Sequence, residues 1–345
     1  MKKIIIIGGG FAGSFLAKKL EKHYNVTLID TKNYFEFTPG ILRTIINPEH
    51  LKNIQVLHKD YLKKSAVIKG SVKSISKNSV SVNSRKIPFD YLAICSGSKY
   101  ISPIKEQNII IASRASQLKK YYENLKNSKN ILIVGGGLVG VELASEIICK
   151  YKDKKITLIH SKTRLMKRTP FKASRYAENF LKKRNVDIIY NERVIENNKN
   201  IFTTDKKTVI SLDLVFWCTG IKTNFEFLLK DFRNCLNEKN HVKVNNYLQV
   251  NNCNNIFAAG DITDIKEEKT AQNAKNQAKI ILNNINTLES KKPLREYKIK
   301  KTALVISLGK YHGILCYKNF VFTGFLPGIL KAIIEKKEML FLRFG

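Results

Sequence analysis

The stretch IIIIGGGFAGSFLA (residues 4–17) decides the fold, and a second stretch, ILIVGGGLVGVELA (residues 131–144), closely repeats it. In each, a run of apolar residues typical of a buried parallel strand ends in three glycines and continues into a helical pattern. A further apolar strand follows each helix, NVTLID (25–30) and KITLIH (155–160). The chain therefore holds two βαβ units, and the sequence predicts an α/β fold with two Rossmann-like dinucleotide-binding domains.

The first glycine run has the spacing of a dinucleotide-binding loop. Gly8, Gly10 and Gly13 form GxGxxG at a junction from strand to helix. The first glycine turns the chain, the second makes room for a pyrophosphate, and the third lets the helix approach the strand. Asp30 ends the next strand, where a carboxylate accepts hydrogen bonds from an adenosine ribose. The predicted cofactor contacts of this unit are Gly8, Gly10, Phe11, Ala12, Gly13 and Asp30.

The second unit has the same motif but ends its second strand differently. His160 stands in place of an acid and is followed by Ser161, Lys162 and Arg164. A carboxylate there would favour the free 2′-hydroxyl of NADH, whereas these side chains tolerate or attract the 2′-phosphate of NADPH. We expect NADPH to be accepted alongside NADH; the alternative is that His160 is a surface residue with no cofactor role. The predicted contacts of this unit are Gly135, Gly137, Leu138, Val139, Gly140, His160 and Lys162.

The composition is that of a globular chain with an unusual charge. The 345 residues are 43% hydrophobic, and their net charge is +33. No apolar run reaches the roughly 18 residues that span a bilayer, so we expect no integral membrane protein. Lys greatly outnumbers Arg and is spread along the chain, which favours a compositional drift over a dedicated nucleic-acid surface. We expect nucleic-acid binding to be at most nonspecific, and attraction to anionic membranes at low salt.

The cysteines and the start of the chain suggest a cellular location. The six cysteines show no CxxC pair and no metal-ligand spacing, which predicts a reducing compartment, no disulfide framework and no metal site. The first strand begins close to the initiator Met and leaves no room for a leader. We therefore expect a cytoplasmic protein, with peripheral contact to the cytoplasmic face of a membrane as a further prediction.

Three more motifs carry a family resemblance: NNIFAAGD (254–261), CSG (95–97) and CTG (218–220). With the two glycine loops, they resemble the flavoproteins with two dinucleotide-binding domains, which include disulfide reductases, ferredoxin reductases and type II NADH:quinone dehydrogenases. The resemblance implies that FAD occupies the first cradle and NAD(P)H the second. It also implies that Asp261 binds the ribityl chain of FAD. The other implied contacts at these turns are Ser96, Gly97, Gly220 and Gly260.

The same resemblance divides the chain into domains. It implies an FAD domain over 1–105 and 225–290, an inserted NAD(P)H domain over 106–224, and a small C-terminal α+β domain over 291–345. In the last, we expect two short strands and an apolar segment.

Within this family, two segments resemble the quinone dehydrogenases. NYFEFTPGILRT (33–44) has no redox cysteine, and its Thr38 and Pro39 match an aromatic-Thr-Pro turn that lies against the flavin. TAQNAKNQA (270–278) resembles a helix near the flavin and quinone, which implies that Ala271 and Gln272 lie there, together with Gln277. Disulfide reduction is therefore not expected.

In detail, the chain resembles the ferroptosis suppressor branch, the quinone reductases similar to apoptosis-inducing factor. The resemblance implies that Glu142, in VGVELASEI (139–147), lies beside the nicotinamide, and that Lys336, in KKEMLF (336–341), lies near flavin N5, with Phe341 after it. One departure is Lys2, which stands where myristoylation in that branch needs glycine. We expect the apolar segment 320–334 to form a short interfacial helix; alternatively, it packs within the domain or in a homodimer.

These features predict an FAD-dependent NAD(P)H:quinone oxidoreductase without proton pumping. In this reading Lys336, Glu142 and Gln272 are the catalytic residues. The alternatives are a ferredoxin or rubredoxin reductase, whose acidic partner would suit the basic surface, and a nucleotide-sensing or DNA-associated flavoprotein. A sulfide:quinone oxidoreductase is less favoured, because it would need a redox role for Cys149 and Cys316.

Overall fold

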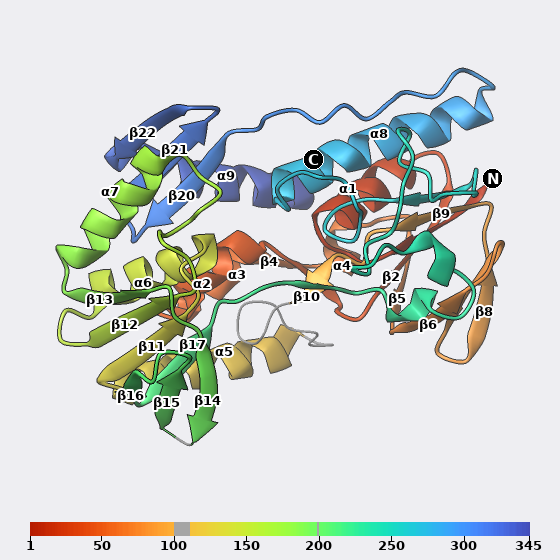
Figure 1. Cartoon of the computed structure of the whole chain (residues 1–345). Helices are drawn as coiled ribbons and strands as arrows, with labels where there is room; N and C mark the ends of the chain where they lie inside the picture. Colours follow the sequence, from red (N-terminus) through yellow and green to blue (C-terminus); the bar gives the residue numbers. More distant parts are fainter. Residues whose placement is uncertain (100–110, 199) are drawn as a thin grey trace.

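A computed structural model of the chain, which describes residues 1–99, 111–198 and 200–345, contains two parallel sheets that each carry one glycine loop (Figure 1). The first sheet has the order β19-β9-β1-β2-β5, and all its pairings are parallel. Its strands are β1 (Lys3–Ile7), β2 (Asn25–Asp30), β5 (Ala66–Lys69), β9 (Tyr91–Ile94) and β19 (Ile256–Ala258).

The side chains of β1 alternate between two apolar layers, as the period of a strand requires. Ile4 and Ile6 join the core beneath α1 (Phe11–Leu20) and α8 (Ala271–Glu289). Ile5 and Ile7 join a second core against an antiparallel sheet on the other face. That sheet consists of β6 (Val72–Ile75), β7 (Ser79–Val82) and β8 (Arg85–Pro88). Burial on both faces explains why the strand is a continuous run of isoleucine rather than an alternating pattern.

The second sheet repeats this plan in the order β13-β12-β11-β17, again all parallel. Its strands are β11 (Asn130–Val134), β12 (Lys155–His160), β13 (Val186–Tyr190) and β17 (Leu214–Trp217). The accompanying elements are α5 (Ile111–Asn127), α6 (Leu138–Lys150), α7 (Phe171–Lys182), β14 (Val194–Asn198), β15 (Ile201–Thr204) and β16 (Val209–Ser211). The predicted α/β fold with two Rossmann-like units is confirmed.

The chain passes between the two sheets through a pair of short strands. β10 (Ser98–Lys99) and β18 (Lys222–Thr223) are antiparallel neighbours, so the outgoing and returning segments lie side by side. The predicted domain boundary between 105 and 106 lies outside the described residues, and the other domain limits stay predictions. Between β2 and β5 lie β3 (Tyr34–Glu36), η1 (Thr38–Gly40), α2 (Ile41–Thr44), η2 (Pro48–His50), α3 (Leu51–Ile54), β4 (Gln55–Leu57) and α4 (His58–Tyr61). Before β19 lie η3 (Glu226–Leu228) and η4 (Arg233–Cys235).

The C-terminal part differs from the prediction in its secondary structure. It has three strands, β20 (Leu304–Leu308), β21 (His312–Tyr317) and β22 (Phe320–Gly324), and a 20-residue helix α9 (Phe325–Phe344). The short helix predicted over 320–334 is wrong at its start, because residues 320–324 pair with β21. Gly324, with φ of 118°, ends the strand. Pro327 falls in the first helical turn, where no intrahelical N–H bond is required.

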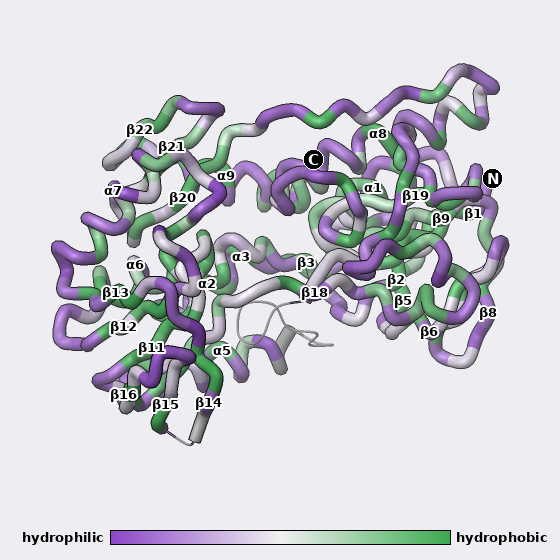
Figure 2. The backbone as a smooth tube through the Cα atoms, in the orientation of Figure 1, coloured by the Kyte–Doolittle hydropathy of each residue, from purple (hydrophilic) through white to green (hydrophobic). Residues whose placement is uncertain are grey.

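A hydrophilic linker connects α8 to β20 and runs along the outside of the molecule, while the strands of both sheets are predominantly hydrophobic (Figure 2). The helix α9 packs on β20 and β21 and reaches back to α3 and α4 of the first unit. The C-terminal strands and helix therefore contact both dinucleotide-binding units. Among the described residues, no helix combines the length and apolar character needed to cross a bilayer.

Candidate functional site

One large cavity joins the two glycine loops. Its volume is about 1810 Å³, above the range of about 300–1,000 Å³ usual for a single small ligand. Both units and α9 contribute to its wall. Predicted site residues that line it are Gly8, Gly10, Phe11, Ala12, Asp30, Thr38, Pro39, Ser96, Gly97, Gly135, Gly137, Leu138, Val139, Glu142, His160, Gly220, Gly260, Asp261, Ala271 and Gln272. The space suits two extended cofactors that meet.

The first loop has the shape of a phosphate cradle. Gly8 has φ of 97°, and a Cβ on it would lie 2.3 Å from the carbonyl oxygen of Cys95. A Cβ on Gly13 would lie 1.8 Å from the carbonyl oxygen of Gly8, so the helix can approach the strand only with glycine there. A Cβ on Gly10 would meet nothing within 4 Å. Gly8 and Gly13 are thus required by the fold, whereas Gly10 faces open space that a pyrophosphate could fill.

Asp30 is fixed at the floor of this cradle. Its Oδ2 accepts a hydrogen bond from the Gly9 N–H (3.1 Å) and lies 3.0 Å from Nε2 of His58. Burial alone would raise the pKa of Asp30, but the hydrogen bond from His58 and the charge of Lys32 outweigh it, so the pKa is below its ordinary value. The carboxylate therefore stays ionised and can accept ribose hydroxyls. Sequence reasoning missed His58, which belongs to no recognisable motif.

The second loop reproduces the same geometry. Gly135 has φ of 114°, and its added Cβ would lie 2.7 Å from the carbonyl oxygen of Cys218. A Cβ on Gly140 would lie 1.9 Å from the carbonyl oxygen of Gly135, while one on Gly137 would meet nothing within 4 Å. The second cradle therefore offers the same open space at its middle glycine.

His160 takes the place of the acid in this cradle. Its Nδ1 accepts the Gly136 N–H (3.1 Å), and burial lowers the pKa of His160, so the neutral ring carries its proton on Nε2. Lys162 does not line the cavity, and Arg164 donates to the carbonyl oxygens of Lys167 and Thr169. The arginines that line it are Arg168 and Arg193, two exposed loop residues that no sequence pattern marks.

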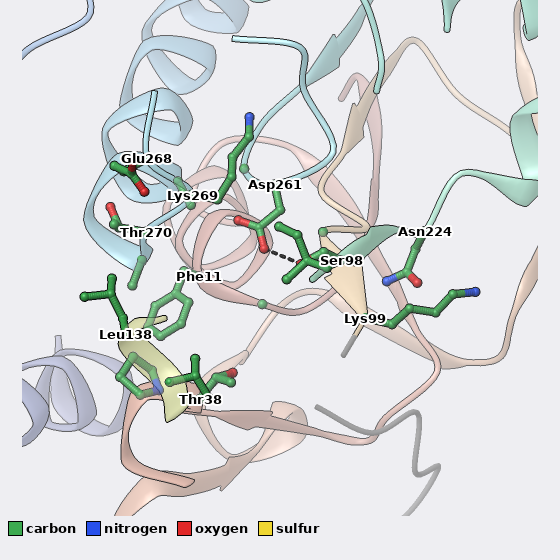
Figure 3. Close-up of a pocket in the computed structure, with 18 of the residues that line it drawn as sticks. Phe11, Thr38, Ser98, Lys99, Leu138, Asn224, Asp261, Glu268, Lys269 and Thr270 are labelled. Carbon is green, nitrogen blue, oxygen red and sulfur yellow. Dashed lines mark hydrogen bonds between the residues drawn. The ribbon is translucent and has the colours of Figure 1, made fainter. Parts of the chain in front are cut away.

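The turns between the units face the same space (Figure 3). Ser98 donates its hydroxyl proton to the carboxylate of Asp261. Ser96 donates to the carbonyl oxygen of Asn224 (2.8 Å), and the Asn224 amide donates back to the carbonyl oxygen of Ser96 (2.8 Å). The two segments that connect the units are thus hydrogen-bonded to each other beside Asp261.

Aromatic side chains form the opposite wall. Phe11, at the start of α1, packs edge-on against Phe35 (5.2 Å) and Phe37 (5.6 Å), and Thr38 and Pro39 follow directly. Figure 3 shows Phe11, Thr38 and Leu138 on the cavity wall. This wall is the apolar side on which a flat ring system could rest.

The start of α8 supplies Ala271 and Gln272, but Gln277 is placed differently from expectation. Gln277 is buried and does not line the cavity. Its Oε1 accepts the Gly260 N–H (2.7 Å), and its amide donates to Glu267 (2.6 Å). Gln277 therefore stabilises the turn before Asp261 from the side that faces the protein interior rather than the cavity.

Glu142 lies in a charged cluster that joins three elements. Its Oε1 accepts hydrogen bonds from the Ser307 N–H (2.9 Å) and hydroxyl (3.2 Å), and it forms an ion pair with Lys331. Glu142 belongs to α6, Ser307 to β20 and Lys331 to α9, so the cluster depends on the C-terminal packing. Lys331 and Glu142 both line the cavity.

Lys336 does not lie where the resemblance implies. It is exposed and absent from the cavity wall, whereas Lys331, Ile334, Lys337 and Glu338 of the same helix line it. At 3.6 residues per turn, Lys336 is rotated about 140° from Lys331 around the helix axis. Phe341 also packs elsewhere: its ring stacks on Phe15 at 5.9 Å, with the Lys275 ammonium 4.2 Å from its centroid.

The cysteines give no sign of disulfide chemistry. Cys95 and Cys218 line the cavity beneath the two glycine loops, and burial raises the pKa of each to about 12, so both thiols stay protonated. Cys149 and Cys316 are not among the cavity-lining residues. Within the described ranges, no group of His, Cys, Asp and Glu has the arrangement of a metal site.

Comparisons with known proteins identify the family of the chain, its relatives and solved structures with the same fold. Residues 2–278 match the family described as pyridine nucleotide-disulphide oxidoreductase. Apoptosis-inducing factor homolog B of Dictyostelium discoideum is 36% identical, over 91% of this chain and 89% of its own. Ferroptosis suppressor protein 1 of Taeniopygia guttata is 29% identical, over 99% and 94%. The structure of NDH2 from Plasmodium falciparum in complex with NADH has a TM-score of 0.85 at 18% identity, covering 99% of this chain and 97% of that one, and shares the fold.

Proposed function

The chain belongs to the pyridine nucleotide-disulphide oxidoreductase family, and from this premise we propose that it is an FAD-dependent NAD(P)H:quinone oxidoreductase that pumps no protons. The observation that carries the proposal is the continuous cavity that joins two glycine cradles, whose lining cysteines, Cys95 and Cys218, are protonated thiols beneath separate loops. The relatives agree with it, since the resemblance to the ferroptosis suppressor and apoptosis-inducing factor proteins is confirmed.

The residues present fit both cofactors. FAD belongs in the first cradle, where Gly10 leaves open space and the ionised Asp30 accepts ribose hydroxyls. Asp261 and the Phe11 wall border its flavin end. NAD(P)H belongs in the second cradle, with Gly137 at its phosphates and His160 at its ribose. When bound, FAD supplies the capacity to take a hydride and pass on two electrons.

The overall reaction is NAD(P)H + quinone + H⁺ → NAD(P)⁺ + quinol, so one proton must come from solution. The residues best placed to hold it are Glu142 and Lys331, which are paired in the cavity wall. Lys331 can donate toward a developing negative charge, while Glu142 and Ser307 keep its ammonium in place. The protein otherwise binds the reactants, aligns them and excludes water.

A quinone suits the cavity better than a protein acceptor. The wall contributed by α9 includes Ile334, which is also partly exposed at the surface, beside Lys331 and Lys337. An apolar ring with polar oxygens matches such a lining. A ferredoxin reductase would pass electrons to an acidic protein, and the basic surface keeps that alternative open to test.

We further propose that the protein contacts an anionic membrane at its C-terminal face. Phe325, Leu326, Ile329 and Ile333 are exposed on α9, and Phe320 and Phe322 are exposed on the preceding strand β22. An apolar face on a strongly basic chain fits a lipid surface with negative headgroups. A second copy of the chain is the other occupant that such a face could take.

Anaerobic stopped-flow absorbance of the yellow holoprotein tests the function. Mixing with NADPH or NADH should bleach the flavin absorbance, and a soluble quinone should then restore it within the turnover time. Bleaching that only a ferredoxin reverses would reject the quinone assignment. Loss of quinone reduction in Cys149→Ser or Cys316→Ser variants would instead favour sulfide:quinone chemistry, whereas we expect unchanged rates because neither thiol lines the cavity.

A further inference from the structure

A buried imidazole lies directly beneath the first glycine loop. His58, the first residue of α4, has no exposed surface. A Cβ on Gly9 would lie 2.4 Å from Cε1 of His58 and 2.6 Å from Oδ2 of Asp30. The backbone of the loop therefore rests on the pair formed by His58 and Asp30.

The charge of Asp30 fixes the direction of the hydrogen bond that it shares with His58. An ionised carboxylate only accepts hydrogen bonds, so Nε2 of His58 must donate to Asp30 across their 3.0 Å contact. Nδ1 lies 2.8 Å from the hydroxyl of Tyr61. Burial raises the pKa of Tyr61 well above its ordinary value, so its hydroxyl keeps its proton and can donate to Nδ1. The two contacts link Tyr61, His58 and Asp30 in one buried network, in which His58 donates to Asp30.

These hydrogen bonds determine which carboxylate oxygen of Asp30 remains available to a ligand. Oδ2 of Asp30 is used by the Gly9 N–H and by His58. Among the described residues, Oδ1 makes only longer contacts, 3.3 Å to the Lys32 N–H and 3.4 Å to the Thr31 hydroxyl. We infer that His58 is a positioning residue for the flavin cofactor: it holds Asp30 so that Oδ1 accepts from the adenosine ribose of FAD. The inference rests on the proposed function only in placing FAD in the first cradle.

In the part of the chain that the structure describes, no buried histidine supports the second cradle in this way. Beneath Gly136, the place that His58 takes under Gly9 is filled by Cδ2 of Leu165, 2.6 Å from an added Cβ, together with the ring of His160. His160 bonds to the loop through a single contact, the Gly136 N–H. The ring also bonds to the backbone of Arg164, so His160 is held by main-chain groups, whereas Asp30 is held by a second buried side chain.

Titration of the flavin-free protein with FAD, followed by quenching of flavin fluorescence, tests the role of His58. His58→Leu removes the donor to Asp30 and should raise the Kd for FAD about 10- to 100-fold, the value of a hydrogen bond to a charged group. His58→Gln places an amide N–H near the position of Nε2 and should stay within about threefold of the parent protein, because the bond to the charged group is retained. Neither measurement involves a quinone, so failure here leaves the acceptor question untouched.

A coupling experiment separates positioning from packing. In an Asp30→Asn background, His58→Leu should change the Kd for FAD little further, because the charge that His58 orients is gone. The Kd for NADPH, bound at the other cradle, should not change in either background. An equal loss in the Gln and Leu variants, or an undiminished effect in the Asn background, overturns the inference. If His58→Leu does not fold, His58→Asn, whose shorter amide does not reach Asp30, takes its place with the same expected loss.

Discussion

Replacing Lys331 by methionine should damage both the fold and the reaction, whereas the same change at Lys336 should damage neither. Lys331 and Glu142 form an ion pair with side-chain exposures of only 15% and 11%. Methionine keeps most of the apolar volume but leaves the carboxylate of Glu142 with Ser307 as its only hydrogen-bonding partner in the described residues. The perturbation is thus confined to one charge.

The magnitude follows from the burial of the pair. Removing one partner of a buried ion pair costs about 3–5 kcal/mol. Because the two donors of Ser307 remain and some solvent reaches the pair, we expect the lower end, about 3 kcal/mol in the free energy of unfolding. Lys336 is exposed, so Lys336→Met should stay within about 0.5 kcal/mol. The double variant Lys331→Met/Glu142→Gln should recover much of the loss, since no unpaired charge is then buried.

Chemical denaturation of the variants and steady-state kinetics with NADPH and a soluble quinone measure the two effects. Loss of a positioned proton donor should lower kcat about 100-fold in Lys331→Met, with FAD content unchanged. The matched Lys336→Met variant should keep its rate. Equal behaviour of the two variants, or a larger loss at Lys336, would refute the geometry around Glu142 and restore the position implied by the resemblance.

Three further outcomes are expected. His160→Asp should lower the ratio of kcat/KM for NADPH over NADH at least about tenfold, because a carboxylate accepting the Gly136 N–H repels the 2′-phosphate; an unchanged ratio would remove His160 from the ribose site. Phe325→Glu combined with Leu326→Glu should abolish co-sedimentation with anionic vesicles at low salt, and a change of oligomeric state instead would assign the exposed face to a second copy. On acidification, FAD should be retained until the pH falls through the pKa of Asp30, which lies below its ordinary value of 3.8. His58→Leu removes a cause of that lowering, so its release midpoint, read by flavin fluorescence, should move to higher pH.

Much of the site follows from local sequence because it depends on backbone shape. Gly8, Gly13 and Asp30 occupy positions set by one strand, one turn and the next strand, and these elements are adjacent in the chain. The same holds for Gly135 and Gly140 in the second unit. Steric requirements of this kind leave a fixed spacing that a reader can recognise.

The residues that sequence reasoning missed depend on contacts between distant segments. His58 reaches Asp30 because α4 folds under the first loop, and nothing in HKDY signals that. Lys331 reaches Glu142, 189 positions away, only after α9 has packed on β20. A lysine-rich helix offers several candidates, and its rotation against the core decides between Lys331 and Lys336. The rotation of α9 against the core cannot be predicted from the local sequence pattern.

The helix α9 therefore connects the exposed apolar face to the wall of the cavity. Lys331 and Ile334 line the cavity, while Ile333 and Lys336 are exposed on the same rigid element. Lys336 lies on the side of the helix that carries Phe325 and the other exposed apolar residues, where a cation can reach lipid headgroups. Anything that binds this face only when α9 is docked must stabilise the contact of Lys331 with Glu142 by the same free energy. Vesicles should consequently raise turnover in the parent protein and have no such effect once Lys331 is replaced, which ties the proposed membrane contact to the reaction through one helix.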